Sequence, residues 1–204
     1  GEGTASSNDF HSALNFSGVL QSKVVFIIRN NGYAISTPES VQTKADNLAC
    51  RATGYGIEGI QINGNDILQV VKTVQYAVDK ARQGDGPTLI EAMTYRLGAH
   101  SSSDDPSCYR DKSEEAAWEK IDVFKRTLQL AHYQIGFSKK DLSVLEKKAD
   151  EKMSELILEC EQYPEPKIDS LFDEVYDHIP LHLQAQKDQY LDFLVDQELG
   201  GSHD

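Results

Sequence analysis

The sequence predicts an α/β fold built on a parallel sheet, followed by a helical C-terminal part. Residues 24–29 (VVFIIR) form a nearly continuous apolar run rich in β-branched residues, which is typical of a strand buried on both faces. Residues 59–63 (GIQIN) and 88–94 (TLIEAMT) are two further strand candidates, and a helical pattern separates them. Strand, helix and strand in this order form the unit of a parallel sheet.

Two helices are expected around these strands. Residues 7–20 carry apolar side chains at helical spacing between a Gly-Glu-Gly turn and the first strand. The second helix begins after Asp66, a suitable N-cap, and stops at the Gly84–Pro87 segment. Its apolar residues recur at helical spacing: Ile67, Val70, Val71, Val74, Ala77, Val78 and Ala81.

The rest of the chain divides into two long connections and a helical end. Residues 32–56 and the polar residues 95–112 are long connections, which in compact domains are usually functional or disordered. We therefore expect an α/β part at 1–112 and a helical extension packed on it at 113–204. The extension carries two apolar stripes, the second after a Ser138 cap with Asp141 three residues on: Trp118, Ile121, Phe124, Leu128 and Ala131, then Leu142, Leu145, Ala149, Met153 and Leu156.

The composition excludes several classes of protein. The 204 residues are 39% hydrophobic, enough for a sizeable core, and the net charge is -13. We expect no nucleic-acid partner, because binding a phosphate backbone needs clustered Lys and Arg. We expect no membrane insertion, because no apolar run approaches a membrane span. Cys50, Cys108 and Cys160 form no CxxC pair, which argues against a disulfide framework or a zinc site.

The first residues and the end of the first strand suggest a metal and phosphate site. Gly1 and Gly3 allow a tight turn and close approach to a ligand, and a helix N-terminus after such a turn attracts phosphate. Glu2 would repel phosphate unless a divalent cation lay between them. Asn31 follows the next strand at the same sheet edge, and a backbone carbonyl near Tyr33 completes an oxygen set that suits Mg²⁺. Each signal alone is an ordinary turn, whereas their combination is specific.

Gly-Glu-Gly at 1–3 and Asn-Asn at 30–31 together resemble the thiamine-diphosphate motif. The longer stretches GEG…RNNGYAISTP and EAMTYRLGAHSSSDDPSCYR resemble the alpha subunits of branched-chain 2-oxo acid dehydrogenases, the decarboxylating component of those complexes. The likeness runs over essentially the whole chain and corresponds to the C-terminal half of such a subunit. It implies part of a thiamine-diphosphate-binding fold, with thiamine diphosphate and Mg²⁺ as cofactors.

The resemblance also implies roles for individual residues. Glu2, Asn31 and the Tyr33 carbonyl resemble the Mg²⁺ ligands of the family. The positions that line the diphosphate correspond to Gly1, Gly3, Thr4 and Arg29. Thr4 stands where the family usually has Ala. The general motif has Asp where Glu2 stands. Eukaryotic branched-chain subunits share the Glu, so the resemblance favours the eukaryotic, mitochondrial type.

The polar connection resembles the active-site loop of the family. His100 would contact the diphosphate region and act as the catalytic residue, since His titrates near neutrality. Ala99 replaces the first His of the usual Gly-His-His. Ser101 resembles a serine that a dedicated kinase phosphorylates, the alternative being an unmodified polar loop. A second family phosphosite aligns with Asp111. The resemblance implies that four residues hold this loop ordered: Arg96, Asp104, Tyr109 and Arg110.

The implied function is that of the alpha subunit of a branched-chain 2-oxo acid dehydrogenase in the mitochondrial matrix. It would decarboxylate a branched-chain 2-oxo acid and pass the acyl group to a lipoyl transacylase. A beta subunit would complete the site in an α2β2 heterotetramer, so we expect this chain alone to be inactive. The alternatives are a pyruvate dehydrogenase alpha subunit and a non-catalytic assembly fragment. A nucleotide-binding Rossmann domain would need a fuller glycine fingerprint.

Overall fold

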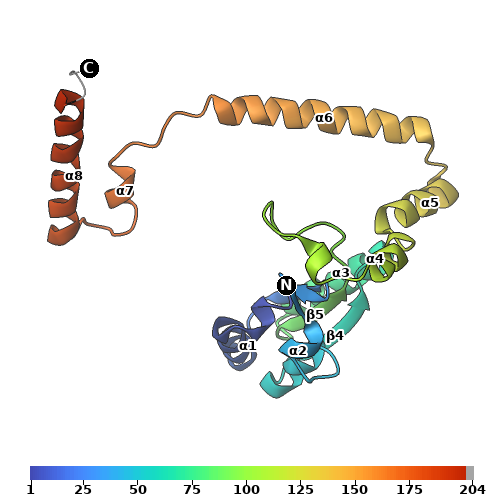
Figure 1. Ribbon diagram of the computed structural model, residues 1–204. Helices are drawn as coiled ribbons and strands as arrows, with labels where there is room; N and C mark the ends of the chain where they lie inside the picture. Colours follow the sequence, from blue (N-terminus) through green and yellow to red (C-terminus); the bar gives the residue numbers. More distant parts are fainter. Residues whose placement is uncertain (201–204) are drawn as a thin grey trace. The chain divides into compact units, whose positions relative to one another are not determined.

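The structure is a computed structural model that describes residues 1–200, with side-chain burial described through residue 197. The chain divides into two compact units, one formed by Gly1–Ser138 and the other beginning at Lys139. The first unit holds the sheet, its connections and helices α1 to α5 (Figure 1). All the predicted site residues lie in this first unit.

A three-stranded parallel sheet forms the centre of the first unit. Its strands β1 (Val25–Asn30), β4 (Glu58–Asn63) and β5 (Thr88–Met93) lie in the order β1-β5-β4. They end in register, because Met93 pairs with Asn30 on one side and with Asn63 on the other. The three carboxyl ends therefore form one edge. The predicted α/β class with a parallel sheet is confirmed.

Two helices flank the sheet where the sequence predicts them. They are α1 (Asn8–Leu20) and α3 (Ile67–Gln83). The side chain of Ser7 accepts a hydrogen bond from a first-turn N–H of α1, and that of Asp66 accepts two at the start of α3. Such caps satisfy N–H groups that have no partner within the helix. Gly84 ends α3 in the left-handed conformation, as the predicted stop requires.

Apolar side chains form a core on each face of the sheet. Along β5, Leu89 joins one core and Ile90 the other, because neighbouring residues of a strand point to opposite faces. The buried members of the first core are Ala5, Leu14, Ile28, Leu48, Ala52, Ile57 and Leu89. Those of the second, on the α3 side, are Ile62, Ala77, Ile90 and Ala92.

The prediction that the strand at 24–29 is buried on both faces is wrong for this chain. Ile27 is 55% exposed, whereas its neighbour Ile28 is buried. The reason is that β1 lies at the edge of the sheet, and of its apolar residues on the α3 side only Val25 packs against the second core. An apolar run shows that a strand can be covered on both faces, but not that this chain supplies both covers.

The two long connections differ. The polar stretch 95–112 contains one short 3-10 helix before α4, η3 (Pro106–Cys108), whereas 32–56 is folded into several short elements. These are β2 (Tyr33–Ala34) and β3 (Thr37–Pro38), which pair as a hairpin, then α2 (Glu39–Gln42) and η2 (Ala49–Tyr55). A further 3-10 helix, η1 (Thr4–Ser6), precedes α1.

The apolar stripe from Trp118 to Ala131 spans two helices rather than one. These are α4 (Lys112–Glu119) and α5 (Val123–Ile135). Asp122 separates them, because its side chain accepts two N–H groups of the first turn of α5 and so caps a new helix. Apolar spacing alone does not reveal such a break.

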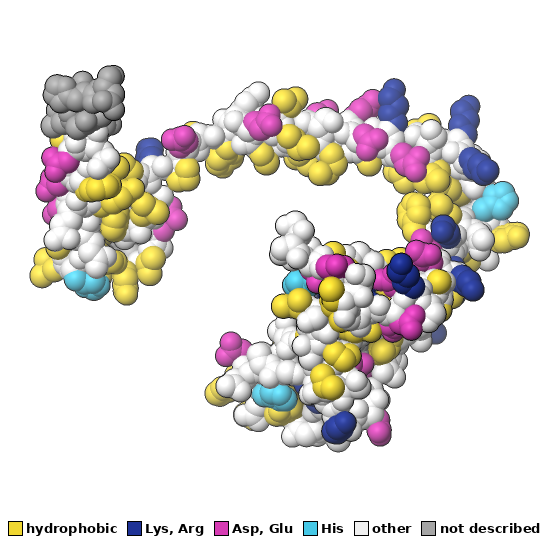
Figure 2. Space-filling view, viewed as in Figure 1, with side chains coloured by type: hydrophobic (Ala, Val, Ile, Leu, Met, Phe, Trp, Pro, Cys, Tyr) yellow, Lys and Arg dark blue, Asp and Glu magenta, His cyan; other side chains and the backbone are white. Residues whose placement is uncertain are grey.

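The second unit contains α6 (Lys139–Glu161), α7 (Ser170–Asp173) and α8 (Leu181–Gly200). Apolar side chains gather along one side of α6 (Figure 2), where several large ones are exposed: Met153, Leu156 and Ile157. The compact units do not coincide with the predicted parts, because α4 and α5 belong to the first unit. The division at 112/113 stays a prediction. Within the described residues, no helix is both long and apolar enough to cross a membrane.

Candidate functional site

Glu2 and Asn31 come together at the carboxyl edge of the sheet. Oε2 of Glu2 accepts a hydrogen bond of 3.1 Å from the backbone N–H of Asn31. The Glu2 side chain is only 2% exposed. Gly1 lies beside the end of β1, since a Cβ built on it would lie 3.9 Å from the carbonyl oxygen of Arg29. Ligands of open α/β sheets bind at this edge.

The third predicted ligand lies on the turn that follows Asn31. Oδ1 of Asn31 accepts the N–H of Tyr33 at 3.2 Å. Between them, Gly32 has φ +87°, a conformation that favours glycine. The Tyr33 carbonyl accepts a long hydrogen bond of 3.4 Å from Nη1 of Arg96. A carboxylate, an amide oxygen and a carbonyl therefore belong to one hydrogen-bonded segment.

The surroundings of Glu2 fit a cation. The carboxylate accepts one backbone N–H, and among the described residues it forms no ion pair with Lys, Arg or His. A buried carboxylate without a positive partner is costly, and a divalent cation would remove that cost. The described residues hold no cluster of three or more His, Cys, Asp or Glu that suits a metal. The remaining oxygen donors would have to be neutral groups, as the set of Asn31 and the Tyr33 carbonyl is.

The residues predicted to line the diphosphate do not all lie in one place. Gly3 and Thr4 stand at the start of η1, which comes between the turn and α1. Arg51, which sequence reasoning missed, donates to the carbonyl of Ala5 and so brings a cation beside this turn. Arg29 is exposed near the end of β1, and its side chain forms no hydrogen bond or ion pair with the described residues. No local signal in the 32–56 connection distinguishes Arg51 from a surface arginine.

His100 and Ser101 lie in an exposed loop that Arg96 links to the turn. Nδ1 of His100 lies 3.5 Å from Nη1 of Arg96, the same nitrogen that reaches the Tyr33 carbonyl. The backbone N–H of His100 donates to Oδ2 of Asp104 at 2.8 Å. Oγ of Ser101 lies 3.2 Å from Oγ of a neighbouring serine. The loop therefore holds His100 near the predicted ligand segment.

The four residues predicted to order this loop do contact one another or its backbone. The Tyr109 hydroxyl donates to Asp104 at 2.7 Å and accepts from Arg96 at 3.0 Å. Hydrogen bonds from the His100 N–H and the Tyr109 hydroxyl lower the pKa of Asp104. The buried side chain of Arg110 donates to three loop carbonyls, those of Arg96, Leu97 and Gly98. The contacts that the prediction requires are therefore present, whereas the claim that they keep the loop ordered stays a prediction.

Comparison with known proteins gives the family. The dehydrogenase E1 component family matches residues 1–169. The chain belongs to this family. The 2-oxoisovalerate dehydrogenase alpha subunit (mitochondrial) of Homo sapiens is 39% identical over 191 residues, which cover 92% of this chain and 42% of the human protein.

Bacterial relatives of this E1 chain are equally similar. The 3-methyl-2-oxobutanoate dehydrogenase alpha subunit of Mycobacterium tuberculosis is 41% identical over 93% of this chain and 52% of its own length. The pyruvate dehydrogenase E1 alpha subunit of Staphylococcus aureus is 40% identical over the same shares, 93% and 52%. The chain thus spans about half the length of these relatives. Identity separates neither the substrate types nor the mitochondrial from the bacterial branch.

Helix α4 of this E1 chain also contacts the site, which the sequence did not reveal. Trp118 stacks on Tyr95, with ring centroids 5.4 Å apart and planes 6° from parallel. The Tyr33 hydroxyl donates to Glu114 at 3.0 Å, and Arg110 pairs with Glu115 at 3.3 Å. The helix thereby contacts both the turn at Tyr33 and the polar connection at 95–112.

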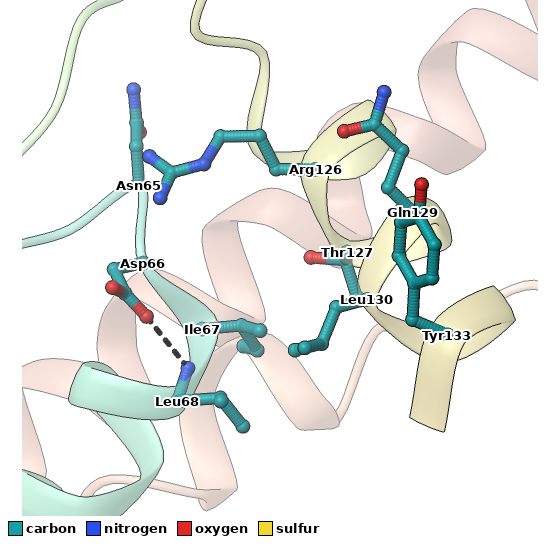
Figure 3. Close-up of a pocket in the computed structure, with 9 residues that line it drawn as sticks. All are labelled: Asn65, Asp66, Ile67, Leu68, Arg126, Thr127, Gln129, Leu130 and Tyr133. Atoms are coloured by element: carbon teal, nitrogen blue, oxygen red, sulfur yellow. Dashed lines mark hydrogen bonds between the residues drawn. The ribbon is translucent and has the colours of Figure 1, made fainter. Parts of the chain in front are cut away.

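A pocket elsewhere in the first unit is separate from this site. It lies between the start of α3 and α5, where Arg126 extends toward Asn65 and Asp66 bends back to the Leu68 N–H (Figure 3). None of the predicted site residues lines it. The candidate site is therefore the carboxyl edge of the sheet and not this pocket.

Proposed function

We propose that this E1 chain is the C-terminal half of a branched-chain 2-oxo acid dehydrogenase alpha subunit and holds thiamine diphosphate and Mg²⁺. The observation that carries the proposal is the buried Glu2 carboxylate, which accepts the Asn31 N–H but has no cationic partner among the described residues. Its position at the end of parallel strands, beside a turn rich in oxygen acceptors, supports a metal-bridged diphosphate site.

Different residues would bind the metal and the diphosphate. Glu2, Oδ1 of Asn31 and the Tyr33 carbonyl would hold the metal. Backbone groups of Gly1, Gly3 and Thr4 would line the diphosphate, and Arg29, exposed at the same edge, would turn its guanidinium to the anionic oxygens. The bound cofactor supplies the electron sink on which a 2-oxo acid loses carbon dioxide.

His100 would be the catalytic residue of this chain. Asp104 fixes the backbone at His100, and Arg96 places the imidazole near the turn that carries Tyr33. From there the ring can donate a proton to negative charge that develops during the reaction. The acyl group would pass to a lipoyl transacylase, and a beta subunit would supply the rest of the site in an α2β2 assembly.

Regulation and location belong to the same proposal. Ser101 is exposed and adjacent to His100, so a kinase can reach it, and a phosphate there would add about two negative charges beside the diphosphate site. The expected result is repulsion and loss of loop order. The proposal of a eukaryotic protein of the mitochondrial matrix is supported by Glu2 in the motif, since the mitochondrial and bacterial relatives are equally similar to this chain.

The substrate decides between two candidates. RNNGYAISTP and SSDDPSCYR favour the branched-chain type, whereas the similarity to a pyruvate dehydrogenase alpha subunit keeps pyruvate as the second candidate. A protein that assembles but does not catalyse is the third possibility, since the chain spans about half of its relatives.

The test compares decarboxylation of 3-methyl-2-oxobutanoate and of pyruvate by the protein that contains this chain, co-expressed with a beta-type subunit. Thiamine diphosphate and Mg²⁺ are supplied, and Glu2→Ala is compared with Glu146→Ala, an exposed glutamate on α6. Preference for the branched acid, lost only in Glu2→Ala, is expected. Preference for pyruvate would replace the substrate and keep the site, and no activity on either acid would favour the assembly role.

A further inference from the structure

Glu91 is a fully buried carboxylate in the central strand that the proposed site does not use. It is 0% exposed, and its oxygens accept hydrogen bonds from two side-chain amides and two backbone N–H groups. Oε2 accepts from the N–H groups of Leu48 and Ala49 at 2.9 and 3.0 Å and from Nε2 of Gln61 at 3.2 Å. Oε1 accepts from Nδ2 of Asn30 at 2.7 Å.

The partners of Glu91 indicate what each oxygen does. Among the described residues it forms no ion pair, so neutral N–H groups alone satisfy its charge. Oε2 joins β5 to the segment that opens η2, which is a structural role. Oε1 reaches only Asn30, the last residue of β1 and the neighbour of the predicted ligand Asn31.

Asn30 connects Glu91 to the turn formed by Asn31, Gly32 and Tyr33. It is also 0% exposed, and its Oδ1 accepts the N–H of Gly32 at 3.1 Å. An amide has one donor end and one acceptor end. Because a carboxylate that accepts four N–H groups offers no proton, it must face the donor end of Asn30. The acceptor end is then left for Gly32, the residue between Asn31 and Tyr33.

We infer that Glu91 is a positioning residue of the metal site, acting through Asn30 on the turn that carries two of the three metal ligands. The inference rests on the proposed function only in taking that turn as metal-binding. Hydrogen bonds behind the ligands of a metal fix ligand orientation, and their loss typically costs about 10–100-fold in metal affinity.

The substitution Glu91→Gln tests whether Glu91 orients the turn through its hydrogen bond with Asn30. The NH₂ group of the introduced glutamine must face other donors, either the backbone N–H groups of Leu48 and Ala49 or the NH₂ group of Asn30, with no acceptor between them. If the Asn30 amide rotates so that its oxygen accepts from the introduced NH₂ group, the Asn30 NH₂ group faces the Gly32 N–H, and that hydrogen bond is lost. The double variant Asn30→Asp with Glu91→Gln restores every pairing at unchanged net charge, because the introduced amide donates to a carboxylate that also accepts the Gly32 N–H. The matched control is Gln61→Ala, which removes a partner of Glu91 but leaves Asn30 untouched.

Two readouts are taken on the assembled protein with its beta-type subunit. The first is the apparent Mg²⁺ affinity, from calorimetric titration with thiamine diphosphate present. The second is hydrogen exchange of the Gly32 amide without ligand. We expect Glu91→Gln to bind Mg²⁺ about tenfold or more weakly and to lose Gly32 protection, the double variant to recover both, and Gln61→Ala to match wild type in both.

Each other outcome has a defined meaning. Wild-type Mg²⁺ affinity in Glu91→Gln, or a folded double variant as weak as the single one, overturns the inference. If Glu91→Gln does not fold, the double variant must fold and bind normally, and its failure to do so also overturns it. If wild type binds no Mg²⁺ with thiamine diphosphate, the proposed function fails instead. Gly32 exchange would then still show whether Glu91 orders the turn.

Discussion

At the residue scale, Gly3 is required for space rather than for conformation. Its φ of -59° is open to any residue, but a Cβ on it would lie 2.8 Å from Cβ of Ala34. The hairpin of β2 and β3, which begins at Tyr33, the predicted carbonyl ligand, therefore packs directly on the Gly-Glu-Gly turn. The glycine serves the contact between two parts of the candidate site.

Gly3→Ala should destabilise the chain by about 1–3 kcal/mol, because the added methyl overpacks this contact. The double variant Gly3→Ala with Ala34→Gly should recover most of that loss, since the methyl group only changes sides. Urea unfolding followed by circular dichroism measures both. Gly54→Ala, at a position with nothing within 4 Å of the new Cβ, is the control. If the double variant is no more stable than Gly3→Ala, the contact is not the cause.

Charge at the residue scale is handled in two different ways. Glu91 is buried with four neutral donors and needs no counter-ion, whereas Glu2 has one donor. The number of N–H groups that each carboxylate accepts thus distinguishes Glu91, which needs no cation of its own, from Glu2, the candidate metal ligand. Two of the four donors to Glu91 are backbone N–H groups at the start of η2 and two are side-chain amides of the neighbouring strands, so the difference cannot be seen in either residue's neighbours along the chain.

At the element scale, α4 contacts the 95–112 loop through Trp118, which stacks on Tyr95. The stack covers one face of the partly buried ring of Tyr95, and this burial, together with the negative charge of Glu114, raises the pKa of Tyr95 to about 12. The folded chain therefore binds more protons than the unfolded chain between the ordinary pKa of 10.0 and about 12. The contribution of protonated Tyr95 to the free energy of unfolding is complete below pH 10 and is lost as the pH rises through the folded pKa of about 12.

Trp118→Ala should lower the pKa of Tyr95 toward its ordinary value of 10.0, because the ring loses its cover. The variant should also unfold about 1–3 kcal/mol more easily. The chain has nine tyrosines, so the tyrosinate absorbance titration is taken as the difference from Tyr95→Phe in each background. Tyr133→Ala, at an exposed tyrosine of α5, is the stability control. An unchanged Tyr95 titration would show that α4 does not cover the ring.

The same element determines loop mobility. With Trp118 removed, the contacts of Glu115 with Arg110 and of Glu114 with Tyr33 lose their support on α4. Limited proteolysis within residues 97–108 should become several-fold faster than in wild type, because local opening exposes the loop. Equal cleavage rates would mean that the hydrogen bonds of Arg96, Asp104 and Tyr109 hold the loop without α4.

At the scale of the whole molecule, the proposed function gives this chain one side of the cofactor site. The predicted ligands lie on a single sheet edge, and β1 is an edge strand with Ile27 exposed. Thermal unfolding of the isolated chain should shift little when thiamine diphosphate and Mg²⁺ are added, since under the proposed function a beta subunit would supply the rest of the cofactor site.

The assembled protein with its beta-type subunit should instead gain about 2.7 kcal/mol at ligand a hundredfold above its dissociation constant. The measurement is a thermal shift for both samples, with Mg²⁺ alone as control. A large shift for the isolated chain would show that residues 1–204 bind the cofactor unaided and would refute the expected division of the site.

The sequence by itself determined what depends on local pattern. Apolar runs and caps located the strands and α3 because each strand and helix carries its own periodicity and end signals. The spacing of the motif predicted that Glu2 and Asn31 lie close together, because the carboxyl ends of parallel strands lie at one edge of the sheet. Only the tertiary structure decided that Ile27 is exposed and that Glu91 orients Asn30. These depend on partners far away in sequence: Leu48 and Ala49 donate to Glu91 across 43 and 42 residues, and no local pattern marks which N–H groups will fold back to a buried carboxylate.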